Sequence, residues 1–206
     1  AQIAAKLLRL LEDKGIKKLV ITTNGSIYDE KILNKLQKSS IPDILVQISI
    51  DSLKPKVHDS FRRHPGALKK AIKFINKLRE MNIPVAIKST IIKETLPEME
   101  SLVKFGIRNG AKRVSFGTVI PVGNAAQEGN YINREEKKKF LIKAGSLKIK
   151  YLKIGVNVSD PLKYSIPKSP WLQDALIKER FAHGGCSAGI TSLSIEPNGV
   201  ITPCPM

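Results

Sequence analysis

Short apolar runs and longer segments with helical periodicity alternate along the first 160 residues of the chain. Each repeat is about 30 residues long, which is the length of a strand joined to a helix. Such repeats predict parallel strands with right-handed crossovers, in an open sheet or in a barrel. The apolar runs lack alternation, which is typical of strands covered on both faces. The expected strands are 19–21, 44–50, 85–92, 113–119 and 153–158, and the expected helices are 3–11, one from about 29, 66–81, 96–108 and 133–146.

The pattern changes after Asp160, where several prolines interrupt the repeats. One short helix is expected over 171–181. Two apolar stretches, 192–196 and 200–202, then flank Pro197-Asn198-Gly199, and Asn-Gly between such stretches predicts a β-hairpin. We therefore divide the chain into a barrel-like domain, a linker with one helix, and the start of a small β-rich module, with the bounds 1–160, 161–183 and 184–206.

The composition excludes several classes of protein. Lys and Arg number 35 against 18 Asp and Glu, a net charge of +17, and 42% of residues are hydrophobic. No apolar run approaches the roughly 18 residues of a membrane span, and the start lacks a signal-peptide pattern. We therefore expect a soluble cytoplasmic protein with no membrane partner. The lysine-rich stretch 137–153 is either the solvated face of a helix or a patch for nucleic acid or an acidic peptide.

Small polar residues follow four successive expected strands, where parallel α/β proteins bind ligands. They are Thr23-Asn24-Gly25, Ser49-Ile50-Asp51-Ser52, Lys88-Ser89-Thr90 and the segment 118–124. Asn-Gly alone is usually a turn, and Ser-x-Asp is often a helix cap. Together the four groups predict a polar pocket lined by hydroxyls and amides, suited to a small polar ligand.

Ordinary acid–base chemistry has little support in this sequence. The three histidines lie in polar segments that we expect to be loops, the pair His58-Asp59 is typical of a helix cap, and no glycine-rich phosphate loop is present. The two cysteines are spaced Cys186-x12-Gly199-x4-Cys204 around the expected hairpin, so both sulfurs could reach one site. A disulfide, a zinc or iron–sulfur site and two buried thiols are the alternatives. A reducing cytoplasm disfavours the disulfide, and a four-ligand site needs further donors.

The order of these motifs resembles radical SAM enzymes of the SPASM/twitch subfamily. The motifs are Thr-Asn-Gly, Ser-Ile-Asp-Ser, His-Asp-x-x-Arg with a following Gly, Pro-x-Gly-Asn, and Cys-x12-Gly-x4-Cys. The resemblance implies a partial (β/α)6 barrel that cleaves S-adenosylmethionine (SAM) at a [4Fe-4S] cluster, with auxiliary clusters in a C-terminal extension. It further implies modification of a peptide or of a precursor of a cofactor such as PQQ, haem or molybdopterin. A reductant such as ferredoxin or flavodoxin would supply the electron.

The resemblance also assigns roles to residues of this chain. It places Asn24 in the turn near the active centre, Ser49 at the ribose or methionine part of SAM, and Arg62 at the SAM carboxylate, with Arg63 as the competitor. The backbone of Ile120 would hold the adenine. The last two matches are auxiliary cluster ligands, Cys186 and Cys204.

The sequence departs from the family at several points. It lacks the Cys-x3-Cys-x2-Cys that holds the SAM-cleaving cluster and the Gly-Gly-Glu-Pro turn, and Lys88 and Thr95 stand where Asn is common. We therefore expect a fragment without the first two barrel strands and with a truncated extension, inactive by itself. One alternative is a cluster-free basic module that binds an acidic peptide or RNA, with salt-sensitive binding. Another is an ordinary barrel enzyme that uses Ser49, Asp51 and Lys88.

Overall fold

The computed structural model describes residues 2–120, 129, 131–159, 194–195 and 200–203. The chain divides into two compact units, Ala1–Ser159 and Asp160–Met206, which are described separately below. Among the described residues, no helix is both long and apolar enough to cross a membrane.

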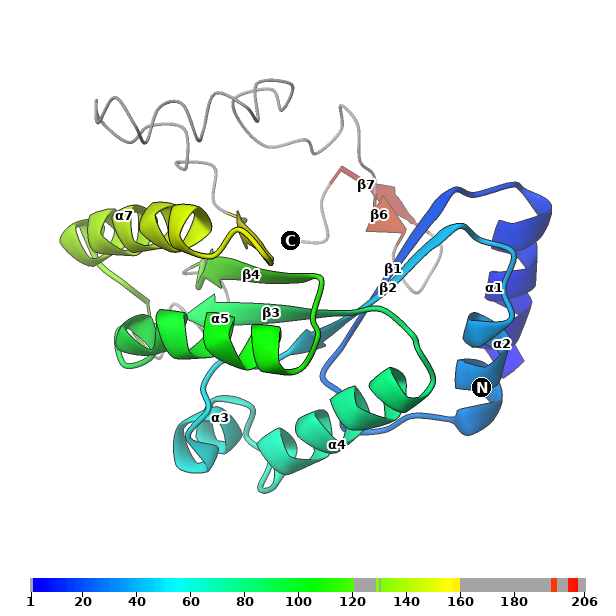
Figure 1. Cartoon of the computed structure of the whole chain (residues 1–206), viewed down its shortest axis with the longest axis horizontal. Coiled ribbons are helices and arrows are strands. Elements are labelled where there is room, and N and C mark those ends of the chain that lie inside the picture. Colours follow the sequence, from blue (N-terminus) through cyan, green and yellow to red (C-terminus); the bar gives the residue numbers. More distant parts are fainter. Residues whose placement is uncertain (1, 121–128, 130, 160–193, 196–199, 204–206) are drawn as a thin grey trace. The chain divides into compact units, whose positions relative to one another are not determined.

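The first unit is a five-stranded parallel sheet with helices between its strands (Figure 1). The strands lie side by side in chain order, β1-β2-β3-β4-β5, and every pair is parallel. The strands are β1 (Lys18–Thr23), β2 (Asp43–Ser49), β3 (Val85–Ile91), β4 (Arg113–Thr118) and β5 (Gly155–Val158). The helices are α1 (Gln2–Asp13), α2 (Glu30–Gln37), α3 (Pro55–Phe61), α4 (Ala67–Glu80), η1 (Leu96–Glu98, a 3-10 turn), α5 (Met99–Arg108) and α7 (Arg134–Lys150).

The sequential strand order distinguishes a barrel-type sheet from a doubly wound one. Right-handed crossovers that all advance in one direction place their helices on the same face of the sheet. Figure 1 shows this arrangement, in which the helices form an arc around the outer side of the strands. Of the two architectures that the sequence allows, the structure has the one that belongs to (β/α) barrels.

Side chains alternate between the two faces of the sheet, and the faces differ in chemistry. At Gly106 of α5, an added methyl group would lie 2.6 Å from Val114 Cγ2 and 3.6 Å from Ile87 Cδ1, so these two residues face the helices. The next residues along the same strands, Lys88 and Ser115, therefore face inward. The helix-covered face holds the apolar core, whose fully buried side chains include Ile48, Ile75, Leu78, Ile87, Leu102, Phe116 and Phe140.

Capping residues precede two of the helices. Asp29 precedes α2, and its side chain accepts a hydrogen bond from the backbone N–H of Lys31. Asn133 precedes α7 and forms a reciprocal capping box with Glu136. These caps satisfy N–H groups that the first helical turn leaves without partners.

The observed elements correct the sequence expectations in several places. Helix α3 was not expected, and it carries His58, which is 1% exposed rather than in a polar loop. The segment expected as one helix over 96–108 begins as the 3-10 turn η1, and α7 continues beyond the expected end at 146. The strands expected to be covered on both faces are buried at most positions in β2, β3 and β4, but their inward positions include polar and charged residues, among them Gln47, Ser49, Lys88 and Ser115.

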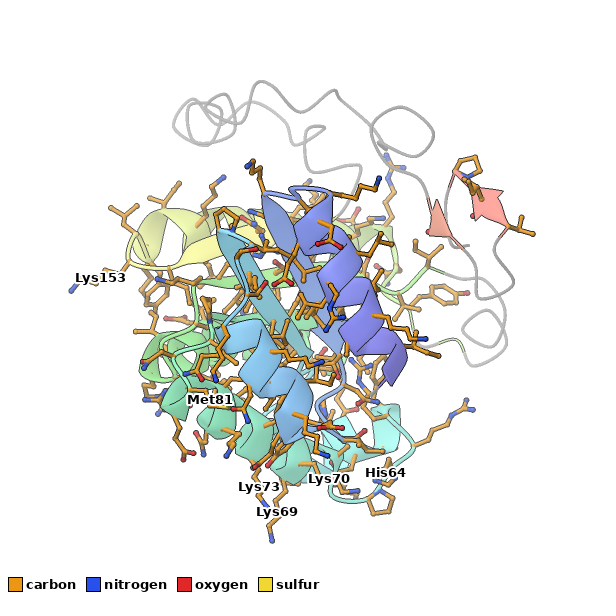
Figure 2. All side chains as sticks on the ribbon, turned by 90° about the vertical axis from the view of Figure 1, so that its right-hand side faces the viewer. His64, Lys69, Lys70, Lys73, Met81 and Lys153 are labelled. Atoms are coloured by element: carbon orange, nitrogen blue, oxygen red, sulfur yellow. The ribbon has the colours of Figure 1, made fainter. Side chains whose placement is uncertain are left out.

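Basic side chains occur in separate groups on the first unit (Figure 2). Lys69, Lys70 and Lys73 project from the start of α4 beside His64, and Lys153 lies at a distance from them. In the lysine-rich stretch, Lys150 pairs with Glu100 at 2.9 Å and Lys143 donates to two backbone carbonyls of η1. Part of this stretch therefore tightens the packing of α7 rather than forming a free surface.

The described part of the second unit is a short antiparallel pair, β6 (Ser194–Ile195) and β7 (Ile201–Thr202). Ser194 pairs with Thr202, and Ile195 with Ile201, so the hairpin expected here is present. Its turn at 196–199, the expected helix at 171–181, the segment 121–124, and both Cys186 and Cys204 lie outside the described residues.

Candidate functional site at the strand ends

The carboxyl ends of β1 to β4 bring the predicted cofactor-binding residues to one edge of the sheet. Asn24 directly follows β1, Ser49 ends β2, and Ile120 lies two residues beyond β4. Asp51 follows β2 and accepts a hydrogen bond from the backbone N–H of Thr90 in β3. Adjacent parallel strands end at the same edge, so this grouping follows from the topology.

Asp51 is a buried polar residue of this edge with several partners. Its side chain is 1% exposed, and its two carboxylate oxygens have different partners. Oδ1 accepts the Thr90 N–H at 2.9 Å, and Oδ2 accepts from Nε of Arg62 at 2.6 Å. A buried carboxylate with both a backbone donor and a guanidinium is well compensated for its lost hydration. Asp51 therefore ties β2, β3 and α3 together.

His58 of α3 holds the backbone at Asp51. Its Nδ1 accepts a 3.1 Å hydrogen bond from the backbone N–H of Asp51, so Nδ1 carries no proton in this arrangement. Nδ1 also lies 3.6 Å from Asp51 Oδ2. Because Nδ1 accepts a hydrogen bond and carries no proton, these two atoms are in contact without forming an ion pair. Burial lowers the pKa of His58, against the opposing effect of Asp51. His58 is thus a neutral ring that fixes the backbone after β2.

Arg62, the residue that follows α3, is held in place by Asp51. Its side chain is 28% exposed, and Nε is used in the ion pair with Asp51. Its guanidinium carbon lies 5.6 Å from the centroid of the Phe61 ring. Arg63 is exposed and has a left-handed backbone, with φ of 52°. Arg62 is therefore anchored at the strand ends through Asp51.

Asp59, the second residue of the His-Asp pair, does cap a helix. Its carboxylate accepts hydrogen bonds from the backbone N–H groups of Gly66 and Leu68, at 2.6 and 2.9 Å. These groups belong to the start of α4, and both hydrogen bonds lower the pKa of Asp59. The two residues therefore have different roles. His58 holds the backbone after β2, and Asp59 caps the start of α4.

The loop after β2 is held by a buried carboxylate that the sequence did not indicate. Glu98 of η1 accepts hydrogen bonds from Ser52 Oγ at 2.9 and 3.0 Å and from the Leu53 N–H at 3.1 Å. Lys54 Nζ lies 3.5 Å from the same carboxylate. Hydrogen bonds therefore hold the loop after β2 at two places. His58 binds the backbone of Asp51, and Glu98 binds Ser52 and Leu53.

The turn after β1 is built by its own polar side chains. Asn24 Oδ1 accepts from the backbone N–H and the hydroxyl of Ser26, at 3.0 and 2.7 Å. Gly25 has φ of +71°, and a methyl group added there would lie 3.1 Å from Cα of Ala71. Glycine is therefore required at this turn both for its backbone and for close packing against α4. Asn24 is exposed, and its Oδ1 serves the turn.

Ser49 and Ile120 complete the group. Ser49 is 9% exposed, and no described residue forms a hydrogen bond with its hydroxyl. Ile120 lies two residues after the end of β4 and is 48% exposed. A ligand that carries both hydroxyl and carboxylate groups suits an edge that offers the Ser49 hydroxyl and the anchored guanidinium of Arg62.

The described residues provide only part of what a radical SAM site requires. Ser49 and Arg62 offer donors that fit the sugar and the carboxylate of SAM. No group of three or more His, Cys, Asp or Glu residues with metal-site geometry is found among the described residues. The candidate cluster ligands Cys186 and Cys204 lie outside them, so their role stays a prediction.

The fold and this edge define an α/β-barrel protein with a polar ligand site at the carboxyl ends of its strands. A sequence model of the Radical SAM superfamily matches residues 1–106, which is more than half of the chain. The chain belongs to this superfamily, whose members use SAM and [4Fe-4S] clusters. The predicted family is confirmed, and the relatives are consistent with the SPASM/twitch subfamily.

Among curated proteins, the chain is similar to the antilisterial bacteriocin subtilosin biosynthesis protein AlbA of Bacillus subtilis, with 28% identity over 191 residues. That match covers 93% of this chain and 39% of AlbA. An AdoMet-dependent heme synthase of Methanosarcina barkeri is 28% identical over 118 residues, which is 57% of this chain and 33% of the synthase. The chain thus spans well under half of the length of these relatives.

Among solved structures, the chain is similar in fold to Streptococcus suis SuiB. The structure of SuiB bound to precursor peptide SuiA matches with a TM-score of 0.72 and 21% identity, and the structure bound to S-adenosylmethionine matches with 0.73. Each match covers 97% of this chain and 45% of SuiB. The predicted barrel-like fold is therefore confirmed.

The family resemblance assigned Arg62 to the site but did not indicate which residues position it. Asp51 was predicted as a strand-end residue of the polar pocket and, in one alternative, as a catalytic group, His58 was expected in a loop, and Glu98 had no predicted role. A signal for Asp51 existed, because an acid directly after a buried strand lies where the ligand edge forms. No sequence pattern indicates the role of Glu98, because its hydrogen-bond partner Ser52 lies 46 positions away in the chain.

Proposed function

We propose that the full-length protein is a radical SAM enzyme that modifies a peptide. The observation that carries this proposal is the family match combined with an anchored guanidinium, Arg62, and a free hydroxyl, Ser49, at the strand ends. When bound, SAM and a reduced [4Fe-4S] cluster supply a 5′-deoxyadenosyl radical that abstracts a hydrogen atom. A one-electron donor such as ferredoxin or flavodoxin would reduce the cluster, which suits a cytoplasmic location.

In this proposal each residue of the chain has a binding or positioning role. The terminal guanidinium nitrogens of Arg62 bind the carboxylate of SAM, because Asp51 occupies Nε and orients the group. Ser49 donates to or accepts from the ribose, the backbone at Ile120 borders the adenine, and Asn24 shapes the turn at the rim. His58 and Glu98 hold the backbone at Asp51 and at Leu53 in place. Cys186 and Cys204 would ligate an auxiliary cluster.

A peptide substrate is supported by three of the similar proteins. AlbA is named for bacteriocin biosynthesis, a second relative is the sporulation killing factor maturation protein SkfB, and SuiB has been solved with precursor peptide SuiA. A haem precursor is the second candidate, because several AdoMet-dependent heme synthases are also similar to the chain.

The two substrate classes can be separated in cells. Mass spectrometry would compare small peptides and porphyrins from cells that express the full-length protein with those from cells that express its Ser49→Ala, Arg62→Met double variant. A mass change confined to a peptide supports the proposal. A change confined to porphyrins selects the haem-precursor function, and identical profiles contradict both.

A further inference from the structure

A groove lies between the first two helices, α1 and α2, which run side by side (Figure 2). One hollow of this groove has a volume of about 320 Å³. Its lining includes the apolar residues Ala5 and Leu8 and three cations, Arg9, Lys35 and Lys38. A second hollow of about 250 Å³ adjoins the first and shares three of these lining residues. The groove therefore combines apolar side chains with basic ones.

The three cations of the groove are exposed, and none of them forms an ion pair with a residue of the described part of the chain. A hollow lined mainly by one sign of charge concentrates the electric field and attracts groups of the opposite sign. Carboxylates are the matching groups on a protein or peptide, because they accept charge-assisted hydrogen bonds from ammonium and guanidinium groups.

The same hollow is also lined by a carboxylate, Glu12, which has partners within the protein. Its Oε1 accepts a 2.5 Å hydrogen bond from Ser39 Oγ and a 3.3 Å hydrogen bond from the backbone N–H of Ser40. These contacts fix the end of α1 to the loop that precedes β2. Three cations against one carboxylate leave the hollow with an excess of two positive charges.

The position of the groove favours a flexible partner over a folded one. Ser39 and Ser40 precede β2, so the groove lies toward the amino end of this strand, whereas Ser49 is at its carboxyl end. The seven residues of β2 separate these two ends by about 20 Å. A folded electron donor in the groove would be kept away from the cofactor edge by this length of sheet. A peptide can span the same length with roughly six extended residues.

We propose that the groove between α1 and α2 binds an acidic segment of the peptide substrate, at least roughly six residues away from the residue that is modified. Carboxylates of this segment contact Arg9, Lys35 and Lys38, and an apolar side chain packs against Leu8. The assignment to a substrate rests on the proposed function, whereas the binding of an acidic peptide rests on the groove alone. Such remote contacts hold a substrate while its reacting part enters the site.

A labelled peptide that repeats Glu-Glu-Ala-Leu is the probe, and the neutral repeat Gln-Gln-Ala-Leu is its control. Each is titrated into the full-length protein at constant ionic strength, and binding is followed by fluorescence anisotropy. The groove variant carries Arg9→Gln, Lys35→Gln and Lys38→Gln. We expect the wild type to bind the acidic repeat and not the neutral one. The groove variant should bind the acidic repeat at least roughly tenfold more weakly, because three charge contacts are lost.

A matched control removes the same number of charges from the exposed start of α4 (Figure 2). This control variant carries Lys69→Gln, Lys70→Gln and Lys73→Gln. Its affinity for the acidic repeat should change by less than about twofold, because salt screens charges outside the contact. Equal losses in the two variants would show that only net charge matters, and the groove would then be overturned as a binding site.

Carbodiimide cross-linking locates the bound peptide, because it joins a carboxylate directly to a lysine amine in contact with it. Mass spectrometry of the digested adduct should find the acidic repeat on Lys35 and Lys38, and links that are mainly on Lys69 or Lys70 would contradict the proposal. A plant-type ferredoxin serves as a second acidic probe. If the groove variant loses ferredoxin binding but keeps the acidic repeat, the groove binds a reductant and the peptide proposal is overturned.

Failure of this proposal can be distinguished from failure of the proposed function, because none of these measurements requires SAM cleavage. If cells that express the full-length protein show changes only in porphyrins, the proposed function and the substrate assignment fail, even where the acidic repeat binds in the groove. If the protein modifies a peptide and the groove variant modifies it with an unchanged KM, the groove proposal fails and the proposed function stands.

Discussion

Arg62 Nε donates a 2.6 Å hydrogen bond to Asp51 Oδ2, which joins the end of α3 to the end of β2. The carboxylate is buried and the guanidinium is partly exposed, so one end of the pair is fixed while the other can meet a ligand. Asp51 is itself fixed by the Thr90 N–H and by the contact of its own N–H with His58. The binding group is therefore positioned before any ligand arrives, which reduces the entropy cost of binding.

Removing the Asp51 carboxylate should destabilise the protein and misplace Arg62. In Asp51→Ala, both the Thr90 N–H and the Arg62 Nε–H lose their acceptor, and we expect a loss of about 2–4 kcal/mol of unfolding free energy. The control is Asp43→Ala, which removes an exposed ion pair with Lys18 and should cost less than about 1 kcal/mol. Urea unfolding measures both, and equal losses would contradict the role given to Asp51.

The buried His58 ring should make stability depend on pH below its ordinary pKa of 6.5. Burial lowers the folded pKa, so the unfolded chain binds a proton at a higher pH than the folded one. Stability is therefore complete above pH 6.5 and falls as the pH decreases toward the folded pKa. His58→Asn, whose Oδ1 can still accept the Asp51 N–H, should lose this component between pH 7.5 and pH 5.5 in denaturant titrations. The same pH dependence in both proteins would contradict a neutral buried ring.

Glu100 should contribute to acid sensitivity in a different range. Hydrogen bonds from Tyr151 and then Lys150 lower its pKa from 4.5 to about 2. A carboxylate with a depressed folded pKa stabilises the protein above pH 4.5, and this stabilisation is lost as the pH falls toward 2. Glu100→Gln should thus be less stable than the wild type at pH 6, and the difference should vanish near pH 2. Exposed Glu94→Gln is the control, and a difference that persists at low pH would contradict the link between α5 and the end of α7.

Gly106 sets how closely α5 approaches β4. A methyl group there would lie 2.6 Å from Val114 Cγ2 and 3.0 Å from Ile154 Cδ1, closer than packed atoms tolerate. Gly106→Ala should destabilise the fold by about 1–3 kcal/mol through overpacking, although alanine is the better helix former. Ser101→Ala, at an exposed position of the same helix, should change stability by less than about 0.5 kcal/mol. A stabilising Gly106→Ala substitution would show that the helix can move away.

Much of the fold followed from periodicity, because the strand and helix segments differ in the spacing of their apolar residues. Helix α3 escaped prediction since Pro55–Phe61 is too short to show that spacing. Inward-facing polar residues such as Lys88 were visible, but their common face depends on strand register, which the sequence alone does not show. Arg62 could be singled out through its motif, whereas its anchoring by Asp51 depends on α3 bringing positions 51 and 62 together.

The resemblance to a family contributed the cofactors, while the residues alone indicated only a polar pocket. Ser49 and Asn24 were selected as strand-end polar groups, and both lie at that edge in the structure. Thr95, one of the departures from the family pattern, is 1% exposed, and its Oγ1 accepts the Ile92 N–H. Its role in the described structure is therefore to cap a turn. Local hydrogen bonds of this kind leave no pattern in the sequence.

Reductive cleavage of SAM tests the central claim most directly. The full-length protein is reconstituted anaerobically with iron and sulfide and reduced with dithionite, and 5′-deoxyadenosine is quantified by chromatography. We predict its formation by the wild type, a rate at least roughly tenfold lower for Arg62→Met, and an unchanged rate for Lys69→Met at an exposed position. An iron-loaded protein that forms no 5′-deoxyadenosine, or an Arg62→Met variant as active as the wild type, would contradict the account.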